Sequence, residues 1–437
     1  MKKQITLGVV SLTRNTFDYE AGQAIYNNIV KDLQKLENVT VVAIEDYVME
    51  PDQAIAAAHK LYSANVDAIA IISSTFHLGH LALEIKKIVD KPLLLWGLNE
   101  LPYNGGKIRL NSVCGVNLNA SNLTKAGYKD FVYTIGDSID QDWLDAIRIQ
   151  VALKNTSVGI IGYRAHGFFN VGVDELALYK KFGCLVNHYE LDDVFKSDYN
   201  KDDAERYAKQ IKATFDTSSI TSLQATKVAE LSAKLKAFMD KNGINALAVR
   251  CWPEFAAGYG ISPCASMSLL QSEGYVLACE GDIDCALTMV AHQAVGAETP
   301  FMADLSQVNL KEDFALMWHC GVAPCNLCDG VCTPTLDTYF AGGKGVTAGF
   351  VMKAGRMTMA RLDSINGEYR LLQECGTASA MDKMLTGTYA KVTFDSGMKA
   401  VLDRVVYSGV AHHVSMVYGD YTASFKIFAK LANIEEV

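Results

Sequence analysis

The first two thirds of the chain alternate between short apolar runs and longer segments in which apolar residues recur every three or four positions. The runs are typical of buried strands, and the spaced segments are typical of amphipathic helices. The N-terminal strands predicted in this way are Ile5–Ser11, Thr40–Ile44, Ala68–Ile72 and Pro92–Trp96, with helices over Ala21–Leu36, Asp52–Ala64 and Leu81–Val89. Short apolar strands separated by helices predict a parallel sheet that is covered on both faces.

The same alternation continues in a second segment. Its predicted strands are Val158–Gly162, Cys184–Tyr189, Ala246–Arg250 and Tyr275–Cys279. Its predicted helices are Gln141–Leu153, Val173–Phe182, Asp202–Ala213, Lys227–Lys241, Ala265–Ser272 and Ile283–Gly296. A second parallel sheet with its own helices is therefore expected.

After about Thr299 the pattern changes to short strands punctuated by glycines. They are Val346–Met352, Arg356–Leu362, Tyr369–Gln373, Ala390–Phe394 and Val401–Val406, followed by a closing helix over Ala423–Ala432. This pattern favours an antiparallel β domain. The predicted fold class is α/β, with two doubly wound, Rossmann-like parallel-sheet domains (1–138 and 139–298) and a β-rich, mainly antiparallel C-terminal domain (299–437).

Composition narrows the class of protein. A chain of 437 residues with 50% hydrophobic and 20% charged residues suits a multidomain globular protein. The net charge of -9 argues against a nucleic-acid partner. No run reaches the roughly 18–20 apolar residues of a membrane span. The N-terminal apolar run is broken by Ser11, Thr13 and Arg14, which indicates a strand rather than a signal peptide. The odd count of 11 cysteines favours reduced thiols in the cytoplasm.

Two acidic residues follow predicted strands of the second sheet. Glu254 comes after the strand that ends at Arg250, and Asp282 comes after the strand that ends at Cys279. Ligands of open α/β sheets gather beyond the carboxyl ends of strands. Two carboxylates with a histidine would suit Mn²⁺, Mg²⁺ or Co²⁺. The alternative is that each is a loop acid or a helix cap, since Asp282 opens a helix.

Histidine is scarce, and two occurrences are candidates for a site. His412 and His413 are adjacent at the start of a predicted strand, and His319 lies in the segment Trp-His-Cys-Gly. Neighbouring residues in a strand point to opposite faces, so only one of the pair would aim at a given metal. The alternative is that these histidines are satisfied core or surface residues.

Three segments together resemble the L-fucose/L-arabinose isomerase family. Pro92–Asn99 is similar to the family's strand with a substrate-contacting tryptophan, here Trp96. Tyr275–Thr288, which contains Glu280-Gly281-Asp282, resembles the strand that carries a metal-binding aspartate. Gly409–Asp420 and the closing helix are similar to the family's C-terminal turn and last helix. The resemblance covers nearly the whole chain at low similarity, although the chain is shorter than L-fucose isomerases.

The resemblance implies a set of site residues. Asp282, His413 and Glu254 would bind a divalent cation such as Mn²⁺, with Glu254 matched less closely. Substrate contacts would come from Arg14, Trp96, His319 and His412. Independently of the resemblance, Arg14, Arg164 and His166 could hold an anionic tail of the sugar, the alternative being that they are ordinary surface residues. In the family the N-terminal residues reach into a neighbouring subunit's site, which implies a homo-oligomer, a hexamer or tetramer.

The implied reaction is aldose–ketose isomerisation of an open-chain monosaccharide. A proton moves between C1 and C2 through a cis-ene-diol, and a metal at O1 and O2 lowers the energy of the anionic intermediate. Glu254 and Asp282 would exchange the proton. The sugar itself is left open among pentoses, 6-deoxyhexoses and acidic or sulfonated hexoses.

Two further signals compete with this interpretation. Cys320, Cys325, Cys328 and Cys332 lie within one short segment, which suggests either an iron–sulfur or zinc site of a redox enzyme or loosely clustered free thiols. The run Gly342-Gly343-x-Gly345 after Tyr339-Phe340 suggests a phosphate cradle or a bend between β elements. A non-catalytic sugar-binding protein built on two α/β units is a third hypothesis.

Overall fold

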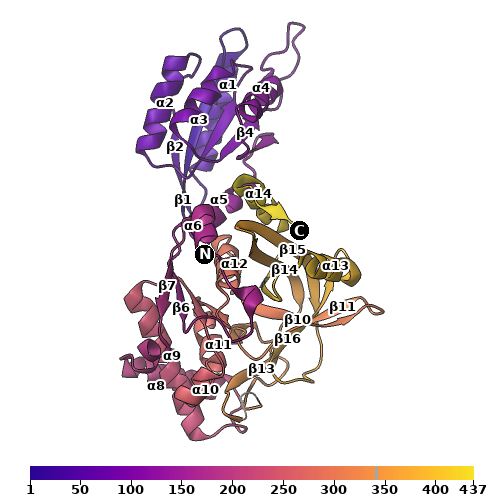
Figure 1. The fold of residues 1–437 in the computed structure, drawn as a ribbon. Coiled ribbons are helices and arrows are strands. Elements are labelled where there is room, and N and C mark those ends of the chain that lie inside the picture. The colour runs from indigo at the N-terminus through magenta and orange to yellow at the C-terminus, as the bar shows by residue number, and fades with distance from the viewer. Residues whose placement is uncertain (340–342) are drawn as a thin grey trace. The chain divides into compact units, whose positions relative to one another are not determined.

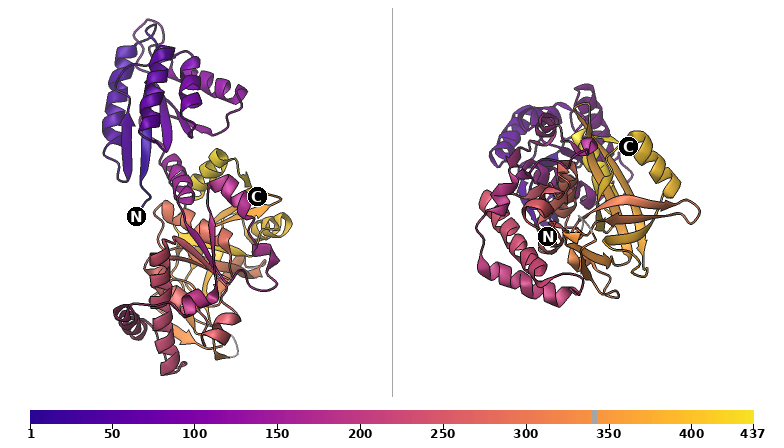
Figure 2. Two further views of the ribbon diagram at one scale, coloured as in Figure 1. Left: turned by 60° about the vertical axis from the view of Figure 1, so that its left-hand side comes forward. Right: turned by 60° about the horizontal axis from the view of Figure 1, so that its bottom comes forward.

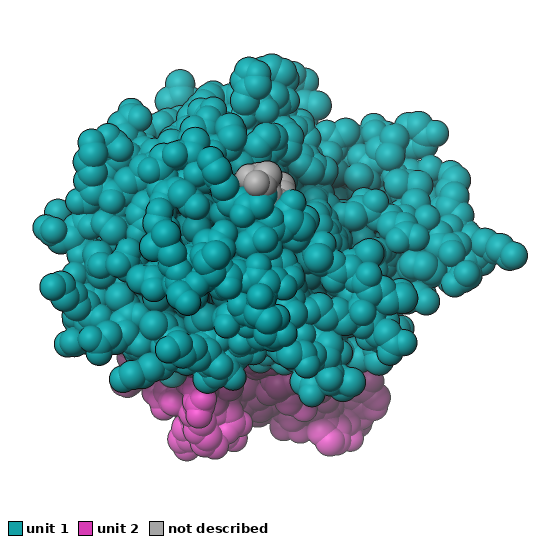
Figure 3. Space-filling model, turned by 90° about the horizontal axis from the view of Figure 1, so that it is seen from below, with its two compact units in different colours: residues 1, 152–422, 435–437 teal, residues 2–151, 423–434 magenta. Residues whose placement is uncertain are grey.

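A computed structural model describes residues 1–339 and 343–437 (Figure 1). The glycine run considered as a phosphate cradle includes Gly342 and follows Phe340, and both lie outside the described residues. The chain forms two compact units, coloured separately in Figure 3. The N-terminal unit comprises residues 2–151 and 423–434, and the large unit comprises residue 1, residues 152–422 and residues 435–437.

The N-terminal unit is built on a parallel sheet in the order β2-β1-β3-β4-β5. Its strands are β1 (Ile5–Leu12), β2 (Val39–Ala43), β3 (Ala68–Ser73), β4 (Leu93–Gly97) and β5 (Phe131–Ile135). The connecting helices are α1 (Tyr19–Leu33), α2 (Pro51–Ser63), α3 (His80–Ile88) and α4 (Ser112–Lys125), followed by α5 (Gln141–Lys154). The helix α14 (Thr422–Ala432) returns to this unit, where the Ser424 hydroxyl donates to Asp142 at 2.7 Å.

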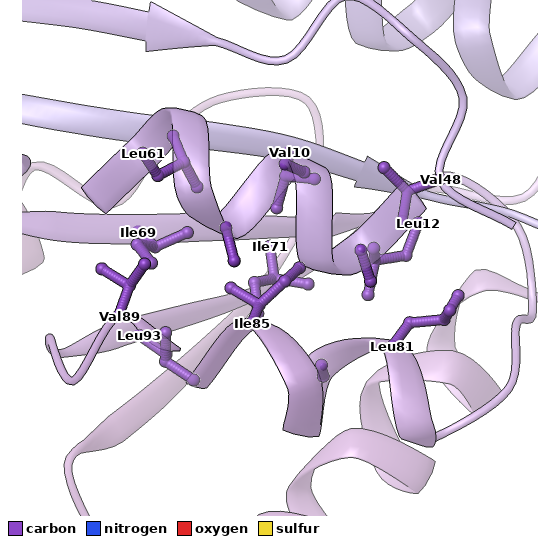
Figure 4. Close-up of a cluster of buried hydrophobic side chains, with 14 of the residues drawn as sticks. Val10, Leu12, Val48, Leu61, Ile69, Ile71, Leu81, Ile85, Val89 and Leu93 are labelled. Atoms are coloured by element: carbon purple, nitrogen blue, oxygen red, sulfur yellow. The ribbon is translucent and has the colours of Figure 1, made fainter. Parts of the chain in front are cut away.

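The core of this sheet explains why the apolar runs form strands. Leu61 of α2 and Ile85 of α3 pack against Val10 and Ile71 of the sheet in one buried cluster (Figure 4). Strands β1, β3 and β4 are buried, so their sequences are nearly continuous apolar runs rather than alternating ones. The predicted strands of this segment are present, whereas β5 and α4 were not predicted.

The large unit contains a second parallel sheet in the order β7-β6-β8-β9. Its strands are β6 (Val158–Ile161), β7 (Val186–Tyr189), β8 (Ala246–Val249) and β9 (Val276–Cys279). The helices of this part are α6 (Glu175–Phe182), α7 (Leu191–Phe195), α8 (Lys201–Thr214), α9 (Ser222–Asn242), α10 (Glu254–Gly258), α11 (Cys264–Ser272) and α12 (Ile283–Ala294).

A mainly antiparallel sheet follows in the order β12-β13-β16-β11-β10-β17-β14-β15-β18. Its strands are β10 (Phe301–Asn309), β11 (Phe314–His319), β12 (Thr335–Asp337), β13 (Thr347–Val351), β14 (Gly355–Ile365), β15 (Glu368–Ser379), β16 (Thr388–Phe394), β17 (His413–Tyr418) and β18 (Glu435–Glu436). Because β15 also pairs with β16, the strands from β16 through β11, β10, β17 and β14 to β15 close into a barrel.

Helix α12 packs between the two sheets of the large unit. It contacts β8 and β9 on one side and β14 and β17 on the other, and Figures 1 and 2 show it beside the barrel strands. The start of α12 therefore lies where the carboxyl end of β9 meets the barrel.

The coarse prediction of a mixed α/β fold with two parallel sheets and one mainly antiparallel sheet is confirmed. The prediction of a strand over Val401–Val406 is wrong, because these residues lie within helix α13 (Met398–Ser408). Met398 and Val401 are buried at helical spacing, Lys399 pairs with Asp403 one turn later, and Gly409 ends the helix in the left-handed conformation. β10 and β11 were not predicted.

Among the described residues, no helix combines the length and the apolar character needed to cross a membrane.

Candidate functional site

A tight turn after β9 holds the first site residue. Glu280 and Gly281 both have left-handed φ angles, +64° and +79°. A Cβ atom on Gly281 would lie 2.5 Å from Cα of Arg164, so only glycine allows the backbones to approach this closely. The amide of Ala165 donates to the Glu280 carbonyl at 2.9 Å. The turn therefore fixes the direction in which the Glu280 side chain leaves β9.

Asp282 caps α12 and is fully buried, with 0% of its surface exposed. It accepts hydrogen bonds from the Cys285 amide at 2.9 Å and from the Arg361 guanidinium of β14 at 2.7 Å. Burial alone raises the pKa of this carboxyl, but the charge of Arg361 and the bond to His413 hold that pKa well below its usual range. Asp282 is thus an anion whose oxygens are already bound.

His413, at the start of β17, lies between two carboxylates. Its Nδ1 is 2.8 Å from Oδ2 of Asp282, and its Nε2 is 2.9 Å from Oε2 of Glu280. The ring is fully buried, which alone lowers its pKa, yet the two carboxylates raise the pKa of His413 to about 9. Since ionised Asp282 only accepts, Nδ1 carries a hydrogen, and the raised pKa favours a second proton on Nε2, facing Glu280. Nε2 presents a lone pair only where another cation takes the place of that proton.

Asp304 on β10 is the direct cross-strand neighbour of His413. Its Oδ1 lies 3.7 Å from Nε2 of His413 and is buried without a hydrogen-bond partner. His319 ends the adjacent strand β11, and its Nδ1 accepts from the Cys320 amide at 2.9 Å. That bond leaves the hydrogen of a neutral His319 ring on Nε2, which is also buried without a partner.

These side chains form a cluster in which carboxylate oxygens converge on Nε2 of His413. One ligating atom from each of Glu280, His319 and His413 lies within 4.8 Å of the others, and the same holds for Asp304, His412 and His413. Oε2 of Glu280 and Oδ1 of Asp304 both face Nε2 of His413, so their charge favours a positive charge at that point. Either the proton that raises the pKa of His413 or a metal ion supplies it. Oxygen and imidazole donors suit a divalent cation such as Mn²⁺, Mg²⁺ or Co²⁺.

Glu254, the other predicted carboxylate, lies at the start of α10. It forms an ion pair with Arg250, and its Oε2 is buried without a hydrogen-bond partner. Within residues 1–339 and 343–437, neither Glu254 nor Asp282 belongs to a group of converging ligand atoms. Glu280 and Asp304 each belong to such a group, in both cases together with His413.

Two predicted substrate residues lie at the margin of the cluster. His412 is exposed, its Nε2 is 3.9 Å from Oε2 of Glu280, and its Nδ1 is 3.0 Å from the Asn170 amide. Arg164 is half-buried between the rings of Tyr163 and Phe169. Among the described residues, no carboxylate pairs with Arg164.

Trp96 and Arg14 belong to the N-terminal unit. Trp96 is 0% exposed and donates to the Gly136 carbonyl at 2.8 Å, so its side chain is part of the core of that unit. Arg14 follows β1 and is half-buried, and its amide donates to the Thr75 hydroxyl at 2.9 Å.

The four cysteines considered as one cluster are separated. Cys320 groups with Cys264 and Cys279, whereas Cys328 groups with Cys332 and Asp329. Cys325 belongs to neither group of the described chain. The hypothesis of one redox centre on Cys320, Cys325, Cys328 and Cys332 is therefore wrong.

Sequence reasoning did not select Glu280 or Asp304. The signal for Glu280 was present, since it is the first residue after the apolar strand that ends at Cys279. Asp304 lies inside β10, where no local pattern distinguishes it from any other strand residue.

Comparisons with known proteins identify the family. Residues 8–144 match the model of the fucose/sulfoquinovose isomerase N-terminal domain, and residues 319–437 match that of the L-fucose isomerase C-terminal domain. A sulfoquinovose isomerase of Priestia aryabhattai is 26% identical over 440 residues, 98% of each chain. One of Alkalicoccus urumqiensis is 27% identical over 389 residues, 86% of each chain.

Solved structures add little. A solute-binding protein of Actinobacillus succinogenes with bound D-allose is 11% identical and covers 66% of this chain and 91% of its own, with a TM-score of 0.19. That score is too low to indicate a shared overall fold. With both terminal domains matched, the chain belongs to the L-fucose isomerase-like family of aldose–ketose isomerases.

Proposed function

We propose that this enzyme is a divalent-metal-dependent isomerase that converts sulfoquinovose into the corresponding ketose. The curated relatives that match over nearly their whole length are named for this sugar. The observation that carries the metal dependence is that Oε2 of Glu280 and Oδ1 of Asp304 both approach Nε2 of His413, at 2.9 Å and 3.7 Å, and that Oδ1 of Asp304 is buried without a hydrogen-bond partner.

Glu280, Asp304 and His413 are the proposed metal ligands, and Mn²⁺ is the expected ion. The turn at Gly281 fixes Glu280, the β10–β17 pairing fixes Asp304, and Asp282 fixes the tautomer of His413. Such outer carboxylates orient a ligating imidazole and raise its basicity. A bound cation would act as a Lewis acid toward O1 and O2 of the open-chain sugar.

Glu280 and Asp304 are also the proposed acid and base of the proton transfer between C1 and C2, which passes through an ene-diol. Asp282 is unsuited to this role, because its oxygens are held by Arg361, His413 and an amide and its pKa is depressed. Oε1 of Glu280 accepts from the Trp252 indole at 3.2 Å, so Oε2 is the oxygen that faces the site. Glu254 is assigned no proton-transfer role because its carboxylate pairs with Arg250.

Two residues are proposed to bind the substrate. Nε2–H of His319 can donate to a sugar oxygen, because Nδ1 is already an acceptor. Arg164 carries a guanidinium with no acidic partner in the described chain, beside the turn of Glu280. A guanidinium suits a sulfonate, because its planar fork of N–H donors can bind two of the three sulfonate oxygens at once.

We expect a cytoplasmic homo-oligomer in which the N-terminal unit, with Arg14, completes the site of a neighbouring subunit. Light scattering coupled to size-exclusion chromatography tests the oligomer. Mixing an Arg14→Ala chain with a Glu280→Gln chain tests the shared site, because partial activity returns only if each chain supplies what the other lacks.

The decisive experiment measures ketose formation from sulfoquinovose by the full chain after EDTA treatment, before and after Mn²⁺ addition. Activity lost with EDTA and restored by Mn²⁺ is expected, with Glu280→Gln and Asp304→Asn inactive. The proposal fails if turnover is unchanged by EDTA or if both variants retain it. Binding of sulfoquinovose without any ketose would instead favour the sugar-binding alternative.

A further inference from the structure

Four cysteine side chains meet in the interior of the large unit, beside the proposed active site. They come from different elements: Cys251 follows β8, Cys264 opens α11, Cys279 ends β9 and Cys320 follows β11. Cys251, Cys264 and Cys279 are 0% exposed and Cys320 is 6% exposed. Only Cys320 belonged to the cysteine-rich segment noted in the sequence, so this cluster exists only in the fold.

The sulfur atoms are close to the spacing of a metal–thiolate site. Sγ of Cys264 and Sγ of Cys320 are 3.7 Å apart, and the sulfurs of Cys264, Cys279 and Cys320 all lie within 4.8 Å of one another. Cys251 lies outside that group of three, but its thiol contacts Cys279, so it is the fourth thiol next to them. A tetrahedral zinc site with Zn–S bonds of about 2.3 Å has sulfurs about 3.8 Å apart.

Other buried thiols of the chain behave differently. Cys184 donates to the Leu153 carbonyl at 2.8 Å, and Cys375 donates to the Met357 carbonyl at 3.1 Å. A thiol is a weak donor that ordinarily finds such a carbonyl acceptor. In the cluster Cys264 and Cys320 face each other instead, as sulfurs do around an ion, although the Cys320 sulfur also lies 3.2 Å from Nδ1 of His319.

The surroundings favour thiolates. The Glu280 amide donates to the sulfur of Cys251, and Cys264 is the first residue of α11, where the helix N-terminus stabilises negative charge. These dipoles offset part of the charge that four thiolates place around a divalent cation.

We propose that Cys251, Cys264, Cys279 and Cys320 form a closed tetrahedral site for a thiophilic ion, Zn²⁺ being the expected one. Binding would displace the thiol protons to solvent and form four metal–sulfur bonds, with no change of oxidation state. The site is separate from the proposed Mn²⁺ site and does not depend on it.

The position of the cluster gives the ion a role. Cys251 precedes Trp252, Cys279 precedes Glu280, and Cys320 follows His319. An ion at the four sulfurs would tie together the ends of β8, β9 and β11, which come from two different sheets. It would thereby position three residues of the active site without touching substrate.

Metal analysis of the full chain tests the proposal. After EDTA dialysis that removes weakly held ions, mass spectrometry should find about one zinc per chain. Refolding or exchange with Co²⁺ should produce the sulfur-to-cobalt charge-transfer band and intense visible bands of a tetrahedral thiolate site. Co²⁺ at an oxygen and nitrogen site gives no such charge-transfer band, so failure of the isomerase proposal leaves this result unaffected.

The double variant Cys264→Ser, Cys279→Ser should lose the zinc and the cobalt band, while Cys328→Ser, Cys332→Ser should keep both. The proposal is overturned if the wild-type chain holds no zinc and gives no charge-transfer band with Co²⁺, measurements that do not require the variants to fold. It is equally overturned if the band persists in the first double variant, or if the wild-type chain carries a Cys264–Cys320 disulfide instead.

Discussion

The carboxylate of Asp282 lies 2.8 Å from Nδ1 of His413, on the side of the ring away from the converging ligand atoms. The same carboxylate is paired with Arg361, and both side chains of that pair are 0% exposed. One buried anion therefore holds both the imidazole and the β14 strand that carries Arg361.

We expect Asp282→Asn to weaken Mn²⁺ binding by about 10–100-fold, because the histidine loses its orienting carboxylate. It should also lower the free energy of unfolding by up to about 3–5 kcal/mol, because buried Arg361 loses its 2.7 Å partner and keeps only the ion pair with Asp363 at 3.2 Å. Calorimetric titration and urea unfolding measure the two effects. Asp395→Asn removes an exposed partner of Arg356 and should cost less than about 1 kcal/mol. Equal effects of the two variants would contradict the assigned role of Asp282.

Variants of Glu280 and Glu254 distinguish the glutamate proposed to transfer the proton from the one proposed to form only an ion pair. Glu280→Gln should reduce kcat by at least about 100-fold, because it removes an acid–base group and a metal ligand together. Glu254→Gln breaks only the ion pair with Arg250 and should leave kcat within about 10-fold of the wild type. Steady-state kinetics with sulfoquinovose decides between them, and a larger loss in Glu254→Gln would return the catalytic assignment to Glu254.

Arg164→Gln should raise KM for sulfoquinovose by about 10–100-fold with little change in kcat, because a charge-assisted contact to the sulfonate is lost. An uncharged aldose turned over by the same enzyme should show no such change. Arg206→Gln is the matched control, since Arg206 pairs with Glu273 on the surface. If Arg164→Gln weakens both sugars alike, the arginine does not read the sulfonate.

The turn after β9 should not tolerate even one added methyl group at Gly281. Gly281→Ala adds a Cβ 2.5 Å from Cα of Arg164 and also strains a φ of +79°. Gly274→Ala strains a φ of +95° but meets nothing within 4 Å. Gly274→Ala should therefore cost about 1 kcal/mol, whereas Gly281→Ala should cost more and also reduce Mn²⁺ affinity. Thermal unfolding and metal titration compare the two, and equal behaviour would contradict the proposed close packing.

Asp284 gives the fold a dependence on pH. Burial raises its pKa to about 7, while the Tyr369 hydroxyl donates to it at 2.8 Å. The folded chain then binds this proton more tightly than the unfolded chain, so its contribution to stability is present at acidic pH and is lost as pH rises to about 7. The Asp284→Asn variant has no titrating proton at this position, so its stability does not fall with pH for this reason. The difference in free energy of unfolding, variant minus wild type, should therefore rise by up to about 4 kcal/mol between pH 4 and pH 7. Urea unfolding across that range tests it, and a pH-independent difference would rule out a buried neutral Asp284.

The sequence pattern predicted those elements whose burial is visible in their own residues. β1, β3 and β4 are apolar throughout because both faces are covered, and that is visible in the sequence. Helix α13 was mistaken for a strand because Val401, Val405 and Val406 are β-branched, although its apolar positions also fit a helix. The roles around Asp282 depend on Arg361 and His413, which are distant in the sequence, so no local pattern could distinguish a buried anchor from a metal ligand.

The same reasoning explains why the sulfur cluster was missed. Cys325, Cys328 and Cys332 attracted attention through their spacing, whereas Cys251, Cys264 and Cys279 are separated by ordinary sequence. These cysteines lie close together only because strands β8 and β9 end at one edge next to β11. That arrangement is a property of the sheet order, not of the local sequence.

The N-terminal unit is completed by residues 423–434, which are synthesised only after the intervening residues 152–422. Phe425 and Phe428 of α14 are fully buried, so without this helix the unit would expose apolar surface. During translation the first sheet would wait for residues 152–434 to leave the ribosome before its core could be completed. A chain that stops short of residue 423 would therefore leave the first unit open, however well the rest had folded.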